Sequence, residues 1–308
     1  MLQKRDNTLI NKNILKSKNI LKNRNLSKNS NMLRDNILWR YKILFSIALF
    51  SFTLFSFTLF FSSSLDAQNT TSAKRSKVKV LAEYPHSRKS YTQGLFFFNG
   101  TMYETCGEYG KSSLKIVDYK KGKVLREWKF NRKYFLEGSC VANGGLYILT
   151  WQEKTCFKFT VPPPVKATSN DLKLLGTANY NTEGWGLTSD GKELIMSNGT
   201  NQLYFLDPSS FYCKRVLNVT INGSPLYYLN ELEFIEGKIW ANVYTAEYIV
   251  IIDPNSGVVE HIIDCTGILP ENLKTHSTDV LNGIAYNPED KSIYITGKNW
   301  PRLYKISL

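Results

Sequence analysis

Histidine is scarce in this chain of 308 residues, and its cysteines are not closely paired. The three histidines, His86, His261 and His276, are far apart, and no two of the five cysteines have C-x-x-C spacing. Zinc sites in proteins need closely spaced Cys and His side chains. The sequence therefore argues against a zinc site of this kind. The cysteines, an odd number that leaves one thiol outside internal disulfides, are Cys106, Cys140, Cys156, Cys213 and Cys265.

Acidic residues are nearly absent from residues 1–42, which hold 11 of the 39 Lys and Arg but only two of the 26 Asp and Glu. That segment carries +9 of the net charge of +13, so the rest of the chain carries only +4. Because the segment is rich in Asn and Lys and poor in core-forming residues, we expect a disordered or weakly helical tail. The globular part is not basic enough to suggest that the chain binds nucleic acid.

Charged residues are also absent between Lys42 and Asp66, where residues 43–61 read ILFSIALFSFTLFSFTLFF. A helix of these 19 residues, rising about 1.5 Å per residue, just covers a bilayer core of about 30 Å. The basic residues before it predict a cytoplasmic N-terminus. We therefore expect a transmembrane signal anchor and a single-pass type II membrane protein, whose C-terminal domain lies in the secretory lumen or outside the cell. A cleaved signal peptide is the alternative.

Five Asn-x-Ser/Thr sequons agree with a secretory route and predict a glycoprotein, although each match is weak taken singly. They begin at Asn69, Asn99, Asn198, Asn218 and Asn222. The secretory route also permits disulfides, whose pairing the sequence leaves open.

Helical periodicity is hard to find beyond residue 79, where Tyr, Phe, Val and Ile alternate with polar residues. Five similar segments of strand, tight turn and strand start at Gly94, Gly138, Gly186, Glu231 and Gly283, with spacings of 44, 48, 45 and 52 residues. Such a period without helices is typical of a β-propeller. The 230 residues from 79 to 308 divide into five units of 46, so we predict an all-β, five-bladed β-propeller.

The predicted organisation has four parts: a basic cytoplasmic tail over 1–42, the anchor over 43–61, a linker over 62–78 and the propeller over 79–308. We expect the last strand, RLYKISL, to share a blade with KVLAEYP over residues 79–85 and so to close the ring. This arrangement predicts one radial domain, which we expect to be a monomer.

Equivalent residues of the repeats should converge, because the innermost strand of each blade lines the central channel. The residues directly before the repeat starts are Gln93, Glu137, Trp185, Asn230 and Asn282. A second equivalent register holds Gly107, Trp151, Gly199, Tyr244 and Lys298. Together these positions predict a pocket of polar groups with aromatic rings and one lysine. Polar channel linings without catalysis are also common, so the repeat by itself predicts binding but not a reaction.

Nine short motifs follow one another from about residue 84 to the C-terminus. They are YTQGL, ETCGEYGKSSL, FLEG, LTW, EGWGLTSDG, LNELE, ANVY, LNGIAY and TGKNWP. In these motifs the chain resembles the plant-type glutaminyl-peptide cyclotransferases, which are five-bladed propellers. The resemblance implies an acyltransferase that converts the N-terminal glutamine of peptides or proteins to pyroglutamate and releases ammonia. It also implies catalysis without the zinc of the unrelated animal-type enzymes.

The resemblance assigns roles residue by residue. Glu137 matches the catalytic glutamate of the family. Gln93, Asn230 and Lys298 match polar pocket residues, and Phe135, Trp151 and Trp185 match the aromatic wall. Three positions differ from the family: Tyr91 stands where Phe is usual, Leu136 where Gly is usual, and Tyr244 where Trp is usual.

The chemistry suits these groups, since the α-amine of the substrate attacks a carboxamide carbon to which it is already tethered. We expect Glu137 to carry a proton from the amine to the leaving ammonia. We expect Asn230 and Lys298 to act with it as catalytic residues, by binding the carboxamide and the developing oxyanion. The substrate-binding residues, which orient the substrate and exclude water, are predicted to be Gln93, Tyr91, Phe135, Trp151, Trp185 and Tyr244.

Two other readings belong to different classes. One is a non-catalytic, membrane-anchored propeller that binds peptide termini or a protein partner. The other is a calcium-dependent propeller hydrolase, which would need a carboxylate-rich channel, whereas only Glu137 among the five strand-start residues is acidic. We predict that no cofactor is required, and a structural calcium ion in the channel is left open.

Overall fold

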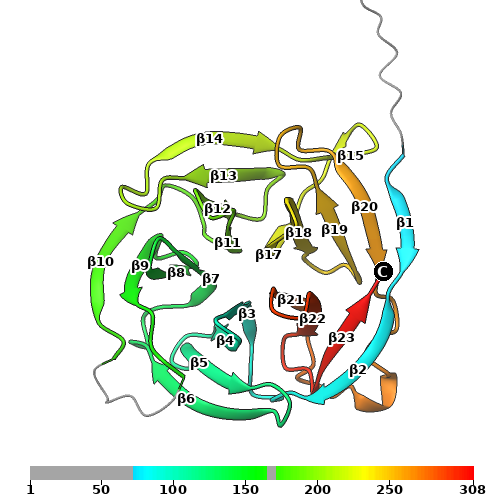
Figure 1. Ribbon diagram of the computed structural model, residues 1–308, viewed down its shortest axis with the longest axis horizontal. Coiled ribbons are helices and arrows are strands. Elements are labelled where there is room, and N and C mark those ends of the chain that lie inside the picture. Colours follow the sequence, from blue (N-terminus) through cyan, green and yellow to red (C-terminus); the bar gives the residue numbers. More distant parts are fainter. Residues whose placement is uncertain (1–71, 165–170) are drawn as a thin grey trace, which may run out of the picture. The chain divides into compact units, whose positions relative to one another are not determined.

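Five β-sheets are arranged radially around a central axis (Figure 1) in the computed structural model, which describes residues 72–164 and 171–308. The prediction of an all-β, five-bladed propeller is therefore confirmed. The tail predicted over 1–42 and the anchor predicted over 43–61 lie outside the described residues. Within the described ranges no helix is long and apolar enough to cross a membrane.

Each of the first three blades is built from four consecutive antiparallel strands, numbered along the chain. The first holds β3 (Thr92–Phe98), β4 (Thr101–Cys106), β5 (Ser113–Asp118) and β6 (Lys123–Lys129). The second holds β7 (Leu136–Ala142), β8 (Gly145–Thr150), β9 (Thr155–Thr160) and β10 (Leu174–Asn179). The third holds β11 (Leu187–Ser189), β12 (Leu194–Ser197), β13 (Gln202–Leu206) and β14 (Cys213–Asn218).

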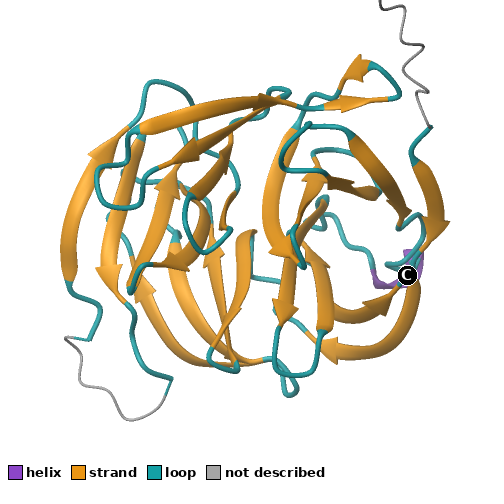
Figure 2. Cartoon of the chain, turned by 45° about the horizontal axis from the view of Figure 1, so that its top comes forward, coloured by secondary structure: helices purple, strands orange, loops and turns teal. Residues whose placement is uncertain are grey.

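The last two blades include strands from the start of the described chain. The fourth holds β17 (Leu229–Ile235), β18 (Lys238–Val243), β19 (Tyr248–Ile252), β20 (Val259–Asp264) and β1 (Lys74–Lys77). The fifth holds β21 (Leu281–Asn287), β22 (Ser292–Gly297), β23 (Arg302–Ser307) and β2 (Lys79–Pro85). The connections between blades contain the hairpin of β15 (Thr220–Ile221) and β16 (Ser224–Pro225) and the short 3-10 helix η1 (Glu271–Leu273), shown in purple in Figure 2.

The ring is closed by the pairing of β2 with β23, with Val80 opposite Ile306, as the sequence predicted. The structure corrects the start of the propeller, because Lys74–Lys77 lies within the predicted linker but forms β1. This strand pairs in parallel with β20 at the edge of the fourth blade. Its sequence, KRSK, has no apolar alternation, and an edge strand held mainly by backbone hydrogen bonds needs none. The first strands therefore join two adjacent blades.

Burial differs between the inner and outer strands, and this explains their sequences. β7 (LEGSCVA) is buried along almost its whole length, because neighbouring blades cover both of its faces. β6 (KVLREWK) lies at the outer edge of its blade, and all of its residues are exposed or half-buried. The inner strands are therefore the ones whose polar residues need partners or a function.

Apolar clusters fill the five junctions between adjacent blades and form the core of the ring. One representative pair per junction is Leu114 with Leu146, Leu149 with Leu194, Ile195 with Ile239, Ile249 with Ile295, and Leu95 with Tyr294. This packing fixes the five blades around the channel, so side chains at the ends of different inner strands are held at set positions.

All five cysteines have free thiols, and four of them are buried. Among the sequons, Asn99, Asn218 and Asn222 are exposed. Asn198 is buried, and its Nδ2 donates to Thr182 Oγ1 over 2.7 Å. A glycan on Asn198 would have to replace that hydrogen bond.

Candidate functional site

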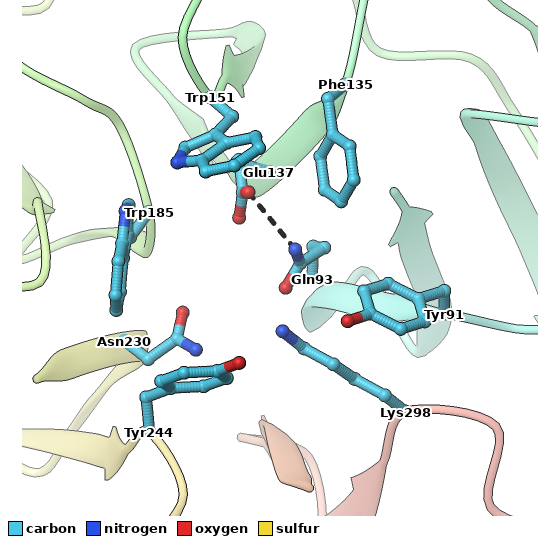
Figure 3. Close-up of a pocket in the computed structure, with 9 residues that line it drawn as sticks. All are labelled: Tyr91, Gln93, Phe135, Glu137, Trp151, Trp185, Asn230, Tyr244 and Lys298. Carbon is cyan, nitrogen blue, oxygen red and sulfur yellow. Dashed lines mark hydrogen bonds between the residues drawn. The ribbon is translucent and has the colours of Figure 1, made fainter. Parts of the chain in front are cut away.

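A pocket of about 250 Å³ lies where the inner strands begin (Figure 3). It is lined by Tyr91, Gln93, Phe135, Glu137, Trp151, Trp185, Asn230, Tyr244 and Lys298. These are the nine side chains that the sequence selected as catalytic or substrate-binding, and they come from all five blades. The structure therefore brings the whole predicted set together around one space.

Irregular strand pairing directs the polar residues into this space. In four of the five inner strands the register shifts, between Thr92 and Gly94, Leu136 and Ser139, Leu229 and Leu232, and Leu281 and Ile284. The residues within these shifts include Gln93, Glu137, Asn230 and Asn282. A β-bulge takes a residue out of the regular ladder and re-aims its side chain. The register chosen from the repeat thus coincides with the bulges.

Close packing of the inner strands explains why glycine follows several of these residues. A Cβ on Gly138 would lie 2.4 Å from the backbone nitrogen of Leu187, and one on Gly186 would lie 2.0 Å from the carbonyl oxygen of Asn230. No side chain fits at these distances. The glycines that mark the repeat therefore let adjacent blades approach at the axis.

Glu137 is only 4% exposed at the base of the pocket. Gln93 Nε2 donates to Glu137 Oε1 over 3.1 Å. Burial raises the pKa of Glu137 well above its usual value, the Lys298 charge lowers it, and the charges of Glu183 and Glu153 raise it further. The carboxyl group therefore takes up a proton much more readily than an exposed glutamate, which is the property of a general acid–base group.

Asn282 corrects one prediction from the repeat, since it lies behind the pocket wall and not in it. The residue is fully buried, and its Nδ2 donates to Thr92 O over 2.9 Å and to Gln93 Oε1 over 3.2 Å. Because Gln93 Oε1 is the acceptor there, the amino group of Gln93 faces Glu137. Asn282 thus orients the amide that contacts the central carboxyl group.

Lys298 reaches into the pocket between two tyrosine rings (Figure 3). Its Nζ lies 4.9 Å from the ring centroid of Tyr91 and 5.2 Å from that of Tyr244, both within cation–π range. Burial lowers the pKa of Lys298, while the charges of Glu137 and Asp279 oppose that change. Within the described part of the chain, the ammonium group makes no hydrogen bond or ion pair, so its N–H donors are available to a ligand.

Asn230 presents a second unused polar group. Its side chain is 3% exposed, and its Oδ1 has no hydrogen-bond partner among the described residues. Buried polar atoms are almost always paired, so an unpaired one in a pocket points to a partner that arrives with a ligand.

Four aromatic rings form the walls in two edge-to-face pairs. The ring centroids of Phe135 and Trp151 are 5.5 Å apart, and those of Trp185 and Tyr244 are 5.7 Å apart. The pocket is therefore apolar around a polar base.

The structure also corrects two positions of the second repeat register. Gly107 and Gly199 do not line the pocket but make room for its walls. A Cβ on Gly107 would lie 2.3 Å from the Phe135 ring, and one on Gly199 would lie 2.6 Å from the Trp185 ring.

Comparison with known proteins identifies the family of the chain. A profile of the glutamine cyclotransferase family matches residues 53–308. The chain belongs to that family. A protein of Arabidopsis thaliana named glutaminyl-peptide cyclotransferase is 35% identical over 249 residues, which are 80% of this chain and 74% of that protein. The crystal structure of Myxococcus xanthus glutaminyl cyclase matches with a TM-score of 0.69 and 30% identity, and the match covers 77% of this chain and 98% of that one.

Membership of the glutamine cyclotransferase family confirms the resemblance inferred from the motifs, and the structure accounts for one of the three unusual positions. Leu136 is fully buried, and it belongs to the apolar cluster between the first two blades, together with Leu114 and Leu146. The side chain therefore packs away from the pocket, although it directly precedes Glu137. At the second position, Tyr91 uses its additional hydroxyl group to donate to Asp279 Oδ2 over 2.8 Å.

Three acidic residues around the pocket were missed by the sequence analysis. Glu183 accepts hydrogen bonds from two wall indoles, Glu153 accepts one from the backbone nitrogen of Phe135, and Asp279 accepts one from Tyr91. All three lie in connections outside the two repeat registers. Their nearness to wall residues in the chain, as in EGW, was the only available signal.

The sequence left open a structural calcium ion in the channel. Among residues 72–164 and 171–308, no three His, Cys, Asp or Glu side chains form a group that fits a metal ion. Glu231, a buried channel carboxyl group, accepts hydrogen bonds from the backbone nitrogens of Leu95 (3.3 Å) and Ile284 (2.8 Å). Its oxygens thus link three blades and face N–H donors, which does not fit a bound calcium ion.

Proposed function

We propose that this chain is a glutaminyl-peptide cyclotransferase that converts the N-terminal glutamine of peptides or proteins to pyroglutamate and releases ammonia. The observation that carries the proposal is the buried Glu137, with its raised pKa, facing unused polar groups of Asn230 and Lys298 in one aromatic-walled pocket. Family membership and the names of both relatives support the same reaction.

Glu137 would act first as base and then as acid. The neutral α-amine attacks the γ-carboxamide carbon, a C–N bond forms, and the amine proton passes to the Glu137 carboxylate. The protonated carboxyl group then gives that proton to the carboxamide nitrogen, the old C–N bond breaks, and ammonia leaves. One carboxyl group can serve both steps, because the proton it accepts is the proton it returns.

Lys298 and Asn230 would stabilise the reacting carboxamide. The Lys298 ammonium group has free donors and can bind the oxygen on which negative charge develops. The unpaired Asn230 Oδ1 can accept a hydrogen bond from the amine or from the carboxamide nitrogen. Both groups are fixed before the substrate arrives, so little reorganisation is needed during the reaction.

The remaining residues would keep the substrate in its folded conformation and exclude water from it. Gln93 is oriented by Asn282 and can help to place the amine beside Glu137. The rings of Phe135, Trp151, Trp185, Tyr91 and Tyr244 would exclude water, which favours ring closure over hydrolysis of the carboxamide.

The membrane assignment is a separate part of the proposal. The apolar segment 43–61 and its basic flank support a signal anchor that places the propeller in the secretory lumen or outside the cell. Alkaline carbonate extraction and protease protection of the full chain in microsomes test it, since release into the wash or a propeller digested without detergent would contradict it. Loss of mass on glycosidase treatment would test the sequons, and light scattering of the purified protein would test the expected monomer.

An ammonia-release assay tests the enzymatic function. The purified full-length chain should release one ammonia per pyroglutamyl peptide formed from Gln-Ala-Ala, with mass spectrometry measuring the peptide. The Glu137→Gln variant is the control for the site. A wild-type chain that binds the peptide without ever releasing ammonia would support the binding-protein alternative and overturn the enzyme proposal.

A further inference from the structure

One carboxylate oxygen behind the aromatic wall accepts hydrogen bonds from two indoles of the pocket. Trp151 Nε1 donates to Glu183 Oε2 over 2.8 Å, and Trp185 Nε1 donates to the same oxygen over 3.0 Å. The two tryptophans come from different places in the chain, since Trp151 follows β8 in the second blade and Trp185 precedes β11 in the third. Glu183 therefore ties together two walls that no strand pairing connects.

This tie constrains the shape of the pocket. Each indole also contacts another wall ring, because Trp151 packs on Phe135 and Trp185 packs on Tyr244. The shared carboxylate thus fixes the relative angle of the two edge-to-face pairs. Hydrogen bonds to an ionised acceptor are stronger than neutral ones and strongly directional. Without Glu183, two half-buried indole N–H donors would lose their partner.

Glu183 also places negative charge near Glu137. The charged and titratable groups that act on Glu137 or respond to its charge are Lys298, Glu183, Glu153, Tyr91, Tyr109 and Tyr180. Of these, Lys298 favours the ionised form of Glu137, whereas Glu183 and, behind it, Glu153 favour the protonated form. The tyrosines are neutral in the working range, since the pKa of Tyr109 is raised to about 12 and those of the other two are also raised.

We propose that Glu183 is a positioning residue of this active site, which fixes the Trp151 and Trp185 walls and supplies the negative charge that balances Lys298 at Glu137. The inference rests on the proposed cyclotransferase function. It assigns two separable contributions to one side chain, namely hydrogen-bond acceptance and charge. A substitution that keeps the first and removes the second can therefore separate them.

The Glu183→Gln variant of the full-length chain makes this separation, because a carboxamide oxygen can still accept both indole N–H groups. We expect it to keep KM for Gln-Ala-Ala within a few fold of wild type. Removing the charge lowers the pKa of Glu137, so the acidic limb of the kcat profile should move to lower pH. The Glu183→Ala variant loses both contributions, and its kcat/KM should fall about tenfold or more, as expected for a lost hydrogen bond to a charged group.

Two carboxamide substitutions serve as matched controls. Glu153→Gln removes the weaker of the two acidic influences on Glu137, so its acidic limb should move in the same direction but less far. Glu260→Gln removes an outer charge that pairs with Lys238, and its profile should superimpose on that of wild type. The free substrate has the same amine pKa in every assay, so differences between variants report the enzyme.

The outcomes are distinguishable from failure of the proposed function. If wild type releases ammonia and Glu183→Gln leaves the acidic limb in place, Glu183 does not supply charge to Glu137 and the inference fails. An Ala variant with unchanged KM and kcat would overturn the wall-fixing role. If wild type releases no ammonia at all, the cyclotransferase proposal itself is wrong. Melting temperatures of all variants show whether a loss reflects unfolding.

Discussion

Two glutamates are equally buried in this propeller, yet they differ in almost everything around them. Glu104, on β4 of the first blade, is 2% exposed, and Glu137, on β7 of the second, is 4% exposed. Glu104 accepts hydrogen bonds from His86 Nε2 at 2.9 Å, Ser90 Oγ at 3.0 Å and Thr92 Oγ1 at 2.7 Å. Among the described residues, Glu137 has one side-chain donor, Gln93. The first carboxyl group is saturated with donors and the second is not.

The pKa values of the two glutamates shift in opposite directions because of this difference. Burial alone would raise the pKa of Glu104, but the charge and hydrogen bond of His86, the charge of Lys115 and the Thr92 hydroxyl group bring it to about 2. Burial also opposes protonation of His86, and Glu104 outweighs it, so the pKa of His86 is raised. At Glu137 burial dominates, because Lys298 is offset by two nearby acids. Equal burial thus gives one permanently ionised carboxylate and one exchangeable proton.

The comparison supports the proposed role of Glu137, because its missing donors distinguish it from a structural carboxylate. A buried carboxylate with a full set of partners stabilises the fold, whereas one whose partners are incomplete costs stability and is retained for another use. The two glutamates should therefore respond to the same Glu→Gln substitution in opposite ways.

The largest effect is expected for Glu137→Gln. Ammonia release should fall about 10²- to 10⁴-fold, the range for loss of a general acid–base group. The melting temperature should rise, because a carboxyl group whose pKa is raised by folding destabilises the folded state at a pH above its unfolded pKa. Activity and thermal unfolding measured on one preparation check both. If activity and melting temperature fall together, Glu137 has a structural role, and the contrast drawn with Glu104 is wrong.

Glu104→Gln should act on stability. Removing one member of a buried ion pair costs about 3–5 kcal/mol, and chemical denaturation would measure the loss. The pKa change from 4.5 to about 2 corresponds to about 3 kcal/mol in wild type. Since this pKa is lowered by folding, that contribution is present above pH 4.5 and lost as the pH falls towards 2.

The Glu104→Gln variant should therefore show a flatter dependence of unfolding free energy on pH in that window. The Glu108→Gln variant is the control, since Glu108 is half-buried and its side chain pairs with Lys111 at the surface. A Glu104 variant as stable as wild type would show that the network around His86 is not structural.

Lys298→Met tests the cation whose charge lowers the pKa of Glu137. The variant keeps an unbranched side chain between the two tyrosine rings but loses the donor, so kcat should fall about 10²- to 10³-fold. The Lys298 charge lowers the pKa of Glu137, so its removal should move the acidic limb of the pH profile to higher pH, opposite to Glu183→Gln. Lys154→Met, at an exposed turn, should change neither. An acidic limb that stays in place would mean that Lys298 does not act on Glu137.

Much of this site was predictable because a propeller repeats its geometry. One register of the repeat contains Gln93, Glu137 and Asn230, and the bulges of the inner strands direct those residues into the pocket. The period also predicted the ring and its closure by β2 and β23. A local repeat therefore carries three-dimensional information whenever equivalent residues face a common axis.

The groups that tune the pocket could not be predicted in this way. Glu183, Glu153 and Asp279 lie in connections that differ between blades, so no repeat position marks them. Their effect depends on hydrogen bonds between residues from different connections, which a one-dimensional pattern does not contain. β1 was not predicted for a similar reason. Its pairing with β20 depends on backbone hydrogen bonds and not on a side-chain pattern.

The smallest effect is expected at Tyr91, where the chain departs from the Phe usual in the family. Tyr91→Phe keeps the ring beside Lys298 and loses the hydroxyl bond to Asp279, which is worth about 0.5–1.5 kcal/mol. Activity on Gln-Ala-Ala should change by less than about tenfold, and Tyr91→Ala, which also removes the ring, should lose clearly more. If Tyr91→Phe were as impaired as Tyr91→Ala, the hydroxyl group and not the ring would position Lys298. The position of Lys298 beside Glu137 would then depend on one hydrogen bond, which Tyr91 donates to Asp279.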